Sequence, residues 1–406
     1  MRIAQRAQRV EPFYVMELAK AAAEMAAGAD ATQREMIYLN IGEPDFTAPE
    51  LVQAAAERAI HDGRSQYTQA TGLPRLREAI SGWYASRFAL DIDPQRIVIT
   101  AGASAALQLA CLALIEAGDE VLMPDPSYPC NRQFVQAAEG RAVLVPSGPD
   151  QRFQLSADQV QAAWGPATRG VLLASPSNPT GTSIARDELE RIARYVRSKG
   201  GVTLVDEIYL GLSFDDAYGH SALGLPDGLG EEVISVNSFS KYFNMTGWRL
   251  GWLVLPPALV PVVERLAQNL FICANTIAQH AALACFAPDS LAEYEKRRAQ
   301  FKARRDYFIP ALDRLGLSVP VMPDGAFYGW ADVGGVCEQW GLPAANPRAP
   351  ESGSWALAFE LMKRCQLATT PGRDFGQADP GRYLRFSYAN SMAQLQEAVK
   401  RLEAAL

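Results

Sequence analysis

The stretch Val233-Ile-Ser-Val-Asn-Ser-Phe-Ser-Lys-Tyr-Phe-Asn-Met-Thr-Gly-Trp-Arg249 guides the interpretation of the whole chain. It begins as a short apolar run typical of a buried strand, and Lys241 follows closely. An ammonium group is costly there unless it has a task, and a deprotonated lysine is a nucleophile towards aldehydes. Ser238, Ser240 and Arg249 add donors that suit a phosphate. An ordinary polar surface loop is the other interpretation.

Similar apolar runs recur from about Arg96 onward and alternate with segments of helical length. The runs are Ile97–Thr100, Val121–Met123, Ala142–Val145, Val171–Ala174, Val202–Val205, Val233–Val236 and Leu250–Leu255. Helical candidates between them include Ala103–Glu116, Arg186–Ser198 and Pro257–Asn269. Buried runs separated by helices favour an α/β fold with a mainly parallel, seven-stranded sheet between helices.

The sequence has a different texture on either side of this region. The N-terminal segment is predicted to be helical, with an apolar stripe of Met16, Leu18, Ala19, Ala22 and Ala23. Beyond Leu291, a charged helical stretch (Ala292–Leu315) precedes strand candidates and a final helix, Met392–Leu406. These features predict a second, smaller α+β domain.

A carboxylate ends one of the runs. In Val202-Thr-Leu-Val-Asp206, the buried Asp206 needs a cationic partner, and a protonated pyridine nitrogen is one. Tyr209 follows closely enough to reach a phenolate oxygen of the same ring. Alternatively, Asp206 caps the next helix.

Two further loops follow strand candidates. Asn178, in Ser-Pro-Ser-Asn-Pro-Thr-Gly, can donate to a ring oxygen or to a substrate carboxylate. Thr100-Ala-Gly-Ala103-Ser104 turns a strand into a helix, whose free amides suit a phosphate, although such glycines also occur for steric reasons. All these loops lie at carboxyl ends of predicted strands, the edge where open parallel sheets bind ligands. We therefore predict one binding site there.

Composition argues against several classes of partner. The net charge is −7 and the chain has no dense basic block, so we expect no nucleic-acid partner. No apolar run approaches the roughly 20 residues of a membrane span, and the N-terminus lacks a signal-peptide pattern. The six cysteines form no C-x-x-C pair, which predicts no metal site and a reduced, cytoplasmic protein.

Together these segments resemble the class I/II aminotransferase family, fold type I among pyridoxal-phosphate enzymes, from Ile41-Gly-Glu-Pro-Asp-Phe46 to Tyr383-Leu-Arg-Phe-Ser-Tyr388. The resemblance implies a large cofactor domain (48–290) and a small domain built from both ends of the chain (1–47 and 291–406). It also implies cis bonds before Pro126 and Pro179.

The resemblance implies a role for each matched residue. Lys241 would carry pyridoxal 5'-phosphate as a Schiff base, Asp206 would pair with its ring nitrogen, and Tyr209 and Asn178 would bond its ring hydroxyl oxygen. The phosphate would be held by Ala103, Ser104, Ser238, Ser240 and Arg249.

Four more residues match the family in the same way. Tyr128 would stack on the ring, and Tyr67 would reach the phosphate of the neighbouring subunit, which implies a homodimer with shared active sites. Arg385 would grip the substrate α-carboxylate in a pocket lined by the Gly42 backbone. Ordinary packing for the tyrosines, and an exposed strand position for Arg385, are the alternatives.

The implied function is transfer of an amino group from an L-amino acid to a 2-oxo acid by ping-pong kinetics. A lyase performing β-elimination on cysteine S-conjugates or cystathionine, or a cyclising enzyme, remains an alternative on this scaffold. A ligand-sensing regulator would need a DNA-binding module, and a plain binding protein would not need Lys241.

Substrate choice follows only weakly from the sequence. Arg132 is the one candidate for binding a distal carboxylate, although a solvated arginine is the simpler interpretation. Phe13, Tyr14 and Phe327 are expected near the entrance, which favours neutral or aromatic amino acids.

Overall fold

The computed structural model describes residues 1–11, 14–27, 35–346 and 353–406. Its largest element is a seven-stranded sheet of order β2-β8-β7-β6-β5-β3-β4. The strands are β2 (Ile97–Thr100), β3 (Glu120–Asp125), β4 (Arg141–Pro146), β5 (Thr168–Ala174), β6 (Val202–Asp206), β7 (Ile234–Ser238) and β8 (Gly251–Val254). Every predicted apolar run overlaps one of these strands, and the predicted mainly parallel α/β fold is confirmed.

Strand β8 runs antiparallel to both of its neighbours, β2 and β7. Because Gly251 at its start pairs with Ser238 at the end of β7, the residues just before β8 lie at the carboxyl edge of the parallel strands. Arg249 is therefore brought to the same edge as Ser238. The sequence predicted β8 as a strand but not its direction.

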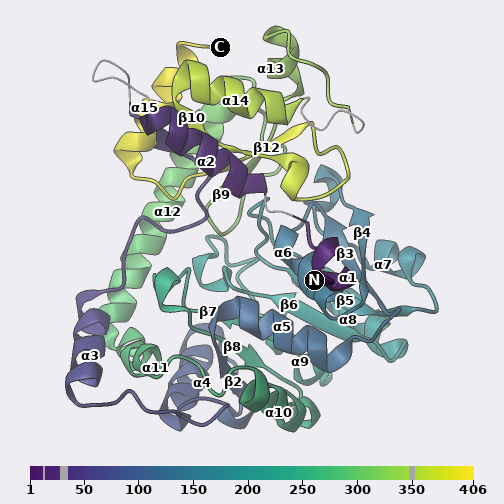
Figure 1. Ribbon diagram of the computed structural model, residues 1–406, viewed down its shortest axis with the longest axis vertical. Helices are drawn as coiled ribbons and strands as arrows, with labels where there is room; N and C mark the ends of the chain where they lie inside the picture. Colours follow the sequence, from purple (N-terminus) through teal and green to yellow (C-terminus); the bar gives the residue numbers. More distant parts are fainter. Residues whose placement is uncertain (12–13, 28–34, 347–352) are drawn as a thin grey trace.

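Helices cover both faces of this sheet (Figure 1). Leu172 and Leu204 pack with helices of one face, whereas Val171 and Val205 pack with helices of the other. Successive strand side chains point to opposite faces, which explains why runs buried on both sides are apolar throughout. The covering helices are α5 (Gly102–Leu114), α6 (Pro129–Ala137) and α10 (Val260–Leu270) on the first face, and α7 (Ala157–Ala163), α8 (Arg186–Ser198) and α9 (Leu229–Glu232) on the second.

The upper part of Figure 1 contains two smaller sheets, one antiparallel (β11-β12-β9) and one parallel (β1-β10). The β1-β10 pair joins an N-terminal strand to a C-terminal one. The strands are β1 (Ile37–Tyr38), β9 (Tyr328–Asp332), β10 (Leu367–Ala368), β11 (Thr370–Pro371) and β12 (Tyr383–Ser387). The helices of this part are α2 (Tyr14–Ala27), α13 (Gly334–Gln339), α14 (Ser354–Cys365) and α15 (Met392–Glu403).

The remaining α-helices link or flank these parts. They are α1 (Gln5–Arg9), α3 (Glu50–His61), α4 (Pro74–Phe88), α11 (Thr276–Ala282) and α12 (Pro288–Arg314). The long helix α12 runs from the part with the smaller sheets down towards α3 and α11, and it corresponds to the predicted charged helical stretch (Figure 1). No helix among the described residues is long and apolar enough to cross a membrane.

The apolar stripe predicted for the N-terminal helix is only partly correct. Leu18 and Ala22 are fully buried, but Met16 is 64% exposed and Ala23 is also exposed. Helix α2 lies against β10, β11, the short turn after them and Trp355 of α14, and it buries the face that carries Leu18 and Ala22. The apolar pattern therefore overestimates how much of this helix is core.

Candidate active site

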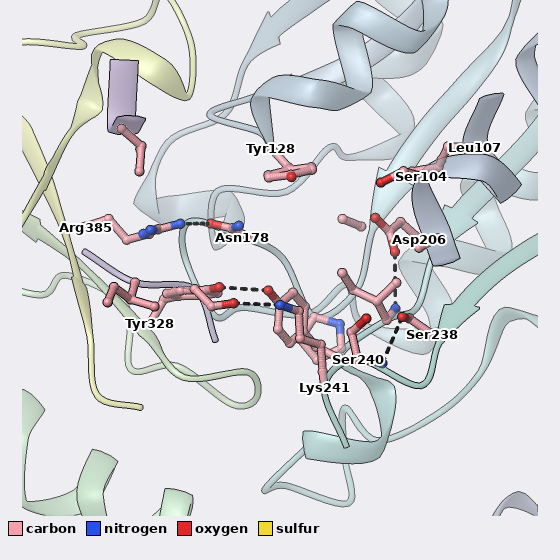
Figure 2. Close-up of a pocket in the computed structure, with 18 of the residues that line it drawn as sticks. Ser104, Leu107, Tyr128, Asn178, Asp206, Ser238, Ser240, Lys241, Tyr328 and Arg385 are labelled. Carbon is pink, nitrogen blue, oxygen red and sulfur yellow. Dashed lines mark hydrogen bonds between the residues drawn. The ribbon is translucent and has the colours of Figure 1, made fainter. Parts of the chain in front are cut away.

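A cavity of about 370 Å³ lies where the carboxyl edge of the large sheet meets the smaller sheets and helix α2. Residues predicted from separate loops line this one space, which confirms that the strand-end edge gathers them (Figure 2). The predicted residues that line it are Gly42, Ala103, Ser104, Tyr128, Asn178, Asp206, Tyr209, Ser238, Ser240, Lys241, Arg249 and Arg385.

One corner of the cavity is rich in hydrogen-bond donors. It combines the N-terminus of α5 with Ser238, Ser240 and Arg249, and the Ser240 amide donates to Ser238 Oγ at 3.0 Å. A Cβ added to Gly102, which has φ of +83°, would lie 2.7 Å from Arg249 Nη2. Glycine therefore allows the guanidinium to lie against the first turn of the helix. Free amides, hydroxyls and a cation at one helix start make a corner suited to a phosphate.

Lys241 lies beside this corner, just after β7. Its Nζ donates to the Gly42 carbonyl oxygen at 2.6 Å, and that loop comes from the N-terminal segment. Burial lowers the pKa of Lys241 to about 8, helped by Arg385 and Arg249 and opposed by Glu43 and Asp206. A lysine with this pKa is about one-fifth neutral near pH 7.4, far more than an ordinary lysine, and its neutral form can act as a nucleophile or base.

Asp206 ends β6 and is almost completely buried. The Ile208 amide donates to Asp206 Oδ1 at 3.2 Å, and burial raises the pKa of this carboxyl to about 7. A carboxylate in this position is costly to ionise without a cation against it. A positively charged ring nitrogen would satisfy Asp206, which is the partner the sequence predicted.

The opposite corner is formed by Arg385 on β12. One guanidinium nitrogen donates to Asn178 Oδ1 at 2.8 Å (Figure 2), and the other donates to the Asn40 carbonyl oxygen at 2.7 Å. The guanidinium also lies over the Tyr328 ring, 4.5 Å from its centroid. Arg385 is only 3% exposed, so the alternative of an exposed strand position is wrong. A fixed, buried guanidinium is well placed to bind a carboxylate.

Two tyrosine hydroxyls meet near the middle of the cavity. Tyr209 Oη lies 2.8 Å from Tyr328 Oη, and both side chains are buried. Tyr128 stands across the cavity from this pair, at the start of α6 (Figure 2). The sequence predicted Tyr209 and Tyr128 but missed Tyr328, which is embedded in an apolar, aromatic stretch that is typical of core.

The sequence also missed the apolar wall of the cavity. Its larger apolar members are Val15 and Met16 on α2, together with Ile41, Leu107, Phe134 and Ile208. Nothing in local periodicity separates a wall residue such as Leu107 from an ordinary core position, because the wall forms only when distant segments meet. Met16 is exposed because it lies at the rim of the cavity.

The expectations about the entrance need correction. Phe327 is fully buried behind Tyr209 and does not line the cavity, while Tyr14 lines a neighbouring cavity instead. Arg132 also faces that neighbouring cavity and pairs with Glu11 at 3.5 Å. Phe13 lies outside the described residues. The apolar character expected at the entrance comes from α2 and Ile41, not from these aromatics.

The remaining predictions concern the cis peptide bonds and the position of Tyr67. The peptide bonds before Pro126 and Pro179 are cis, as expected, and the bond before Pro176 is also cis. Tyr67 is 82% exposed and lies in a separate surface groove, so it does not reach the cavity of its own chain. Its predicted contact with a neighbouring subunit stays a prediction.

Comparisons with known proteins agree over the whole length. A model for the family described as aminotransferase class I and II matches residues 34–402. The chain is 38% identical over 393 residues to the valine–pyruvate aminotransferase of Mycobacterium tuberculosis, covering 97% of this chain and 96% of that protein. The crystal structure of an aminotransferase from the same organism matches with a TM-score of 0.90 at 38% identity, covering 100% and 99% of the two chains. A single mutant of Thermus thermophilus aspartate aminotransferase gives 0.88 at 30% identity and covers 100% of both.

Proposed function

The chain belongs to the class I and II aminotransferases, and from that premise we propose that it uses pyridoxal 5'-phosphate to move amino groups from neutral L-amino acids to 2-oxo acids. Its aminotransferase activity and its fold type I architecture follow from the family. The observation that carries the proposal is the placement of Lys241, Asp206 and the donor corner around one cavity.

The residues present fit the proposed cofactor. The donor corner of Gly102, Ala103, Ser104, Ser238, Ser240 and Arg249, called the phosphate end from here on, would hold the phosphate group. Asp206, whose pKa is raised by burial, would face the ring nitrogen, and Tyr209 with Asn178 would face the ring oxygen. Tyr128 would stack on the ring. When bound, pyridoxal phosphate supplies an aldehyde that condenses with amines and a cationic ring that accepts electrons from the substrate Cα.

The remaining chemistry belongs to side chains of this chain. Arg385 and Asn178, called the carboxylate end, would bind the substrate α-carboxylate and fix the orientation of the Cα–H bond. With its amine free and neutral, Lys241 would accept the proton from the substrate Cα at Nζ and hold it there as an ammonium. Asp206 would keep the ring nitrogen protonated. Because the 2-oxo acid product leaves before the second substrate binds, kinetics should be ping-pong.

The lining of the cavity supports a neutral, aliphatic substrate side chain. Among the described residues that line it, the cations are Lys241, Arg249 and Arg385, and each has a task above. Arg132, the only candidate for a distal carboxylate, faces the neighbouring cavity. Val15, Met16 and Ile41 offer apolar surface instead. The relative named valine–pyruvate aminotransferase supports the same class.

The proposal extends to assembly, location and domain division. We infer a homodimer in which Tyr67, exposed in the single chain, completes the phosphate end of the partner. None of the six cysteines, all of which are among the described residues, forms a disulfide, which supports a cytoplasmic enzyme. We keep residues 48–290 as the large domain, with 1–47 and 291–406 as the small one.

The test is a single-turnover experiment with the cofactor-loaded protein and individual amino acids. Valine, alanine, phenylalanine, aspartate and cystathionine are each added, and the visible absorption band of the cofactor is followed. Bleaching by valine or alanine with formation of one equivalent of 2-oxo acid is expected. Fastest bleaching by aspartate would contradict the neutral class. Release of pyruvate and ammonia from cystathionine without bleaching would indicate β-elimination instead, although the named relatives favour amino transfer.

A further inference from the structure

Tyr328, which no sequence motif marked, contacts both Tyr209 near the middle of the cavity and Arg385 at the carboxylate end. Its hydroxyl lies 2.8 Å from the Tyr209 hydroxyl, and its ring lies under the Arg385 guanidinium at 4.5 Å. The side chain has no solvent exposure. A Cβ added at Gly42 would meet the Tyr328 hydroxyl at 2.6 Å, so the loop that accepts the Lys241 ammonium also confines this hydroxyl. Tyr328 thus contacts the groups proposed for the ring oxygen and for the substrate carboxylate.

The hydrogen-bonding capacity of the two hydroxyls sets what this contact can do. Each phenol donates one hydrogen and accepts from its lone pairs. Among the described residues, Tyr209 is the side chain that shares a hydrogen bond with the Tyr328 hydroxyl. If Tyr209 donates its hydroxyl hydrogen to Tyr328, it cannot also donate that hydrogen to the ring oxygen of the cofactor. If Tyr328 donates to Tyr209 instead, the Tyr209 hydroxyl hydrogen is free to point into the cavity. The hydrogen bond from Tyr328 to Tyr209 and the one from Tyr209 to the ring oxygen then strengthen each other.

The surroundings favour the second arrangement. The groups with charge or titratable protons that face the pair are Arg385 on β12, Tyr128 at the start of α6, and Lys241 after β7. Burial raises the pKa of Tyr328 and of Tyr209, while Arg385 acts to lower both. Since the guanidinium lies directly over the Tyr328 ring, it makes the Tyr328 hydroxyl the better placed donor.

We propose that Tyr328 is a positioning residue that donates its hydrogen bond to Tyr209 and so directs the Tyr209 hydroxyl proton to the ring oxygen of the cofactor. The inference rests on the proposed function, because it assigns Tyr209 to that oxygen. Tyr328 also supports the Arg385 guanidinium through its ring. The two contacts can be separated, since Tyr328→Phe removes the hydroxyl and keeps the ring.

The direct readout is the pH at which the visible spectrum of the lysine-bound cofactor changes. A hydrogen bond to the ring oxygen stabilises its anionic form, so losing that bond raises this spectroscopic pKa. Tyr209→Phe should raise it most. Tyr328→Phe should raise it by roughly half a pH unit, because it weakens the Tyr209 bond without removing it. It should also lower kcat about fivefold, the net effect of one hydrogen bond, and leave KM unchanged.

The double variant decides whether Tyr328 acts through Tyr209. In a Tyr209→Phe background, Tyr328→Phe should cause no further rise in the spectroscopic pKa and no further loss of cofactor affinity, measured by titrating apoprotein with pyridoxal phosphate. Tyr388→Phe is the matched control: Tyr388 is equally buried nearby, and its hydroxyl donates to the Gly325 carbonyl oxygen instead. It should lower the melting temperature without moving the spectrum.

Two results would overturn the inference. An unchanged spectrum in Tyr328→Phe would mean that Tyr209 needs no partner, and equal shifts in both backgrounds would mean that Tyr328 acts on the cofactor by another route. In either case the wild-type protein would still show its visible band. Absence of that band in the wild type would instead contradict the proposed function itself.

Discussion

At the phosphate end of the cavity Ser104 and Arg249 are exposed, whereas at the carboxylate end Arg385 and Asn178 are 3% and 7% exposed. The phosphate end is built from loops that each follow or precede a neighbouring strand of one sheet. The carboxylate end joins residues from β12, the loop after β5 and the segment before Gly42. In the single chain, the phosphate end thus combines these exposed groups with the buried Ser238 and Ser240, whereas the carboxylate end is buried in the interior.

This difference predicts unequal sensitivity to change. Charges at an exposed site are screened by salt and tolerate loss, while a buried guanidinium that loses its geometry leaves partners unsatisfied. Lys241 lies between the two ends.

The largest effect is expected for Lys241→Ala. Removing the amine takes away both the attachment point and the proton-transfer group, so kcat should fall about 10⁴-fold. Steady-state transamination of valine with pyruvate provides the measurement. Lys296→Ala, which changes an exposed lysine on α12, is the control and should keep full activity. Activity retained in Lys241→Ala would assign the chemistry elsewhere.

Arg385→Lys should have the next largest effect. An ammonium cannot replace a planar guanidinium that bonds Asn178 and the Asn40 carbonyl oxygen together, so kcat/KM should fall about 10²- to 10³-fold. Cofactor affinity should stay unchanged. Arg382→Lys alters an exposed arginine beside the same strand, paired with Asp332, and should be silent. Equal losses of kcat/KM in Arg385→Lys and Arg382→Lys would show that the carboxylate end is no more sensitive than the protein surface.

The pH dependence of cofactor capture tests the environment of Lys241. Only the neutral amine attacks an aldehyde, and its pKa of about 8 means that the neutral fraction rises with pH through that value. Stopped-flow rates of pyridoxal phosphate binding to apoprotein should increase about tenfold from pH 7 to pH 9. A lysine with an ordinary pKa would give an increase of about a hundredfold, and that result would show that burial does not act on Lys241.

Arg249→Gln tests the contribution of the exposed guanidinium at the phosphate end. The dissociation constant of the cofactor should rise about tenfold at low salt, and the difference from wild type should shrink as ionic strength increases. The KM for valine should not change. Arg265→Gln on α10 is an exposed control. A salt-independent loss, or a changed KM, would show that the two ends are not separate.

The smallest effect is expected for Asp374→Asn, which changes the residue that anchors the start of α2. Asp374 accepts hydrogen bonds from the Tyr14 and Val15 amides at 2.9 and 2.7 Å, which fixes the start of the helix that lines the cavity. Asp374→Asn should raise the KM for valine about threefold, the cost of a weakened helix cap, with little change in kcat. Cofactor affinity serves as the internal control. A drop in kcat alone would argue that α2 is not part of the substrate wall.

The contrast between the two ends also explains what the sequence could predict. Strand runs and the loops that follow them are local features, so Lys241, Asp206 and Ser238 were predictable together with the edge that gathers them. The direction of β8 was not predictable, because an apolar run does not indicate which strands it pairs with or in which direction. Arg385 was identified only by resemblance, and Tyr328 and Leu107 were missed because their roles depend on contacts between distant segments.

The central claim is that Lys241 carries the cofactor, and borohydride reduction of the loaded protein tests it most directly. Reduction fixes any lysine–cofactor bond, and mass spectrometry of the digested protein then locates it. The added mass of the reduced cofactor should appear on the peptide containing Lys241 and on no other, and Lys241→Ala should carry no label. A label on another lysine, or no label in the wild type, would contradict it.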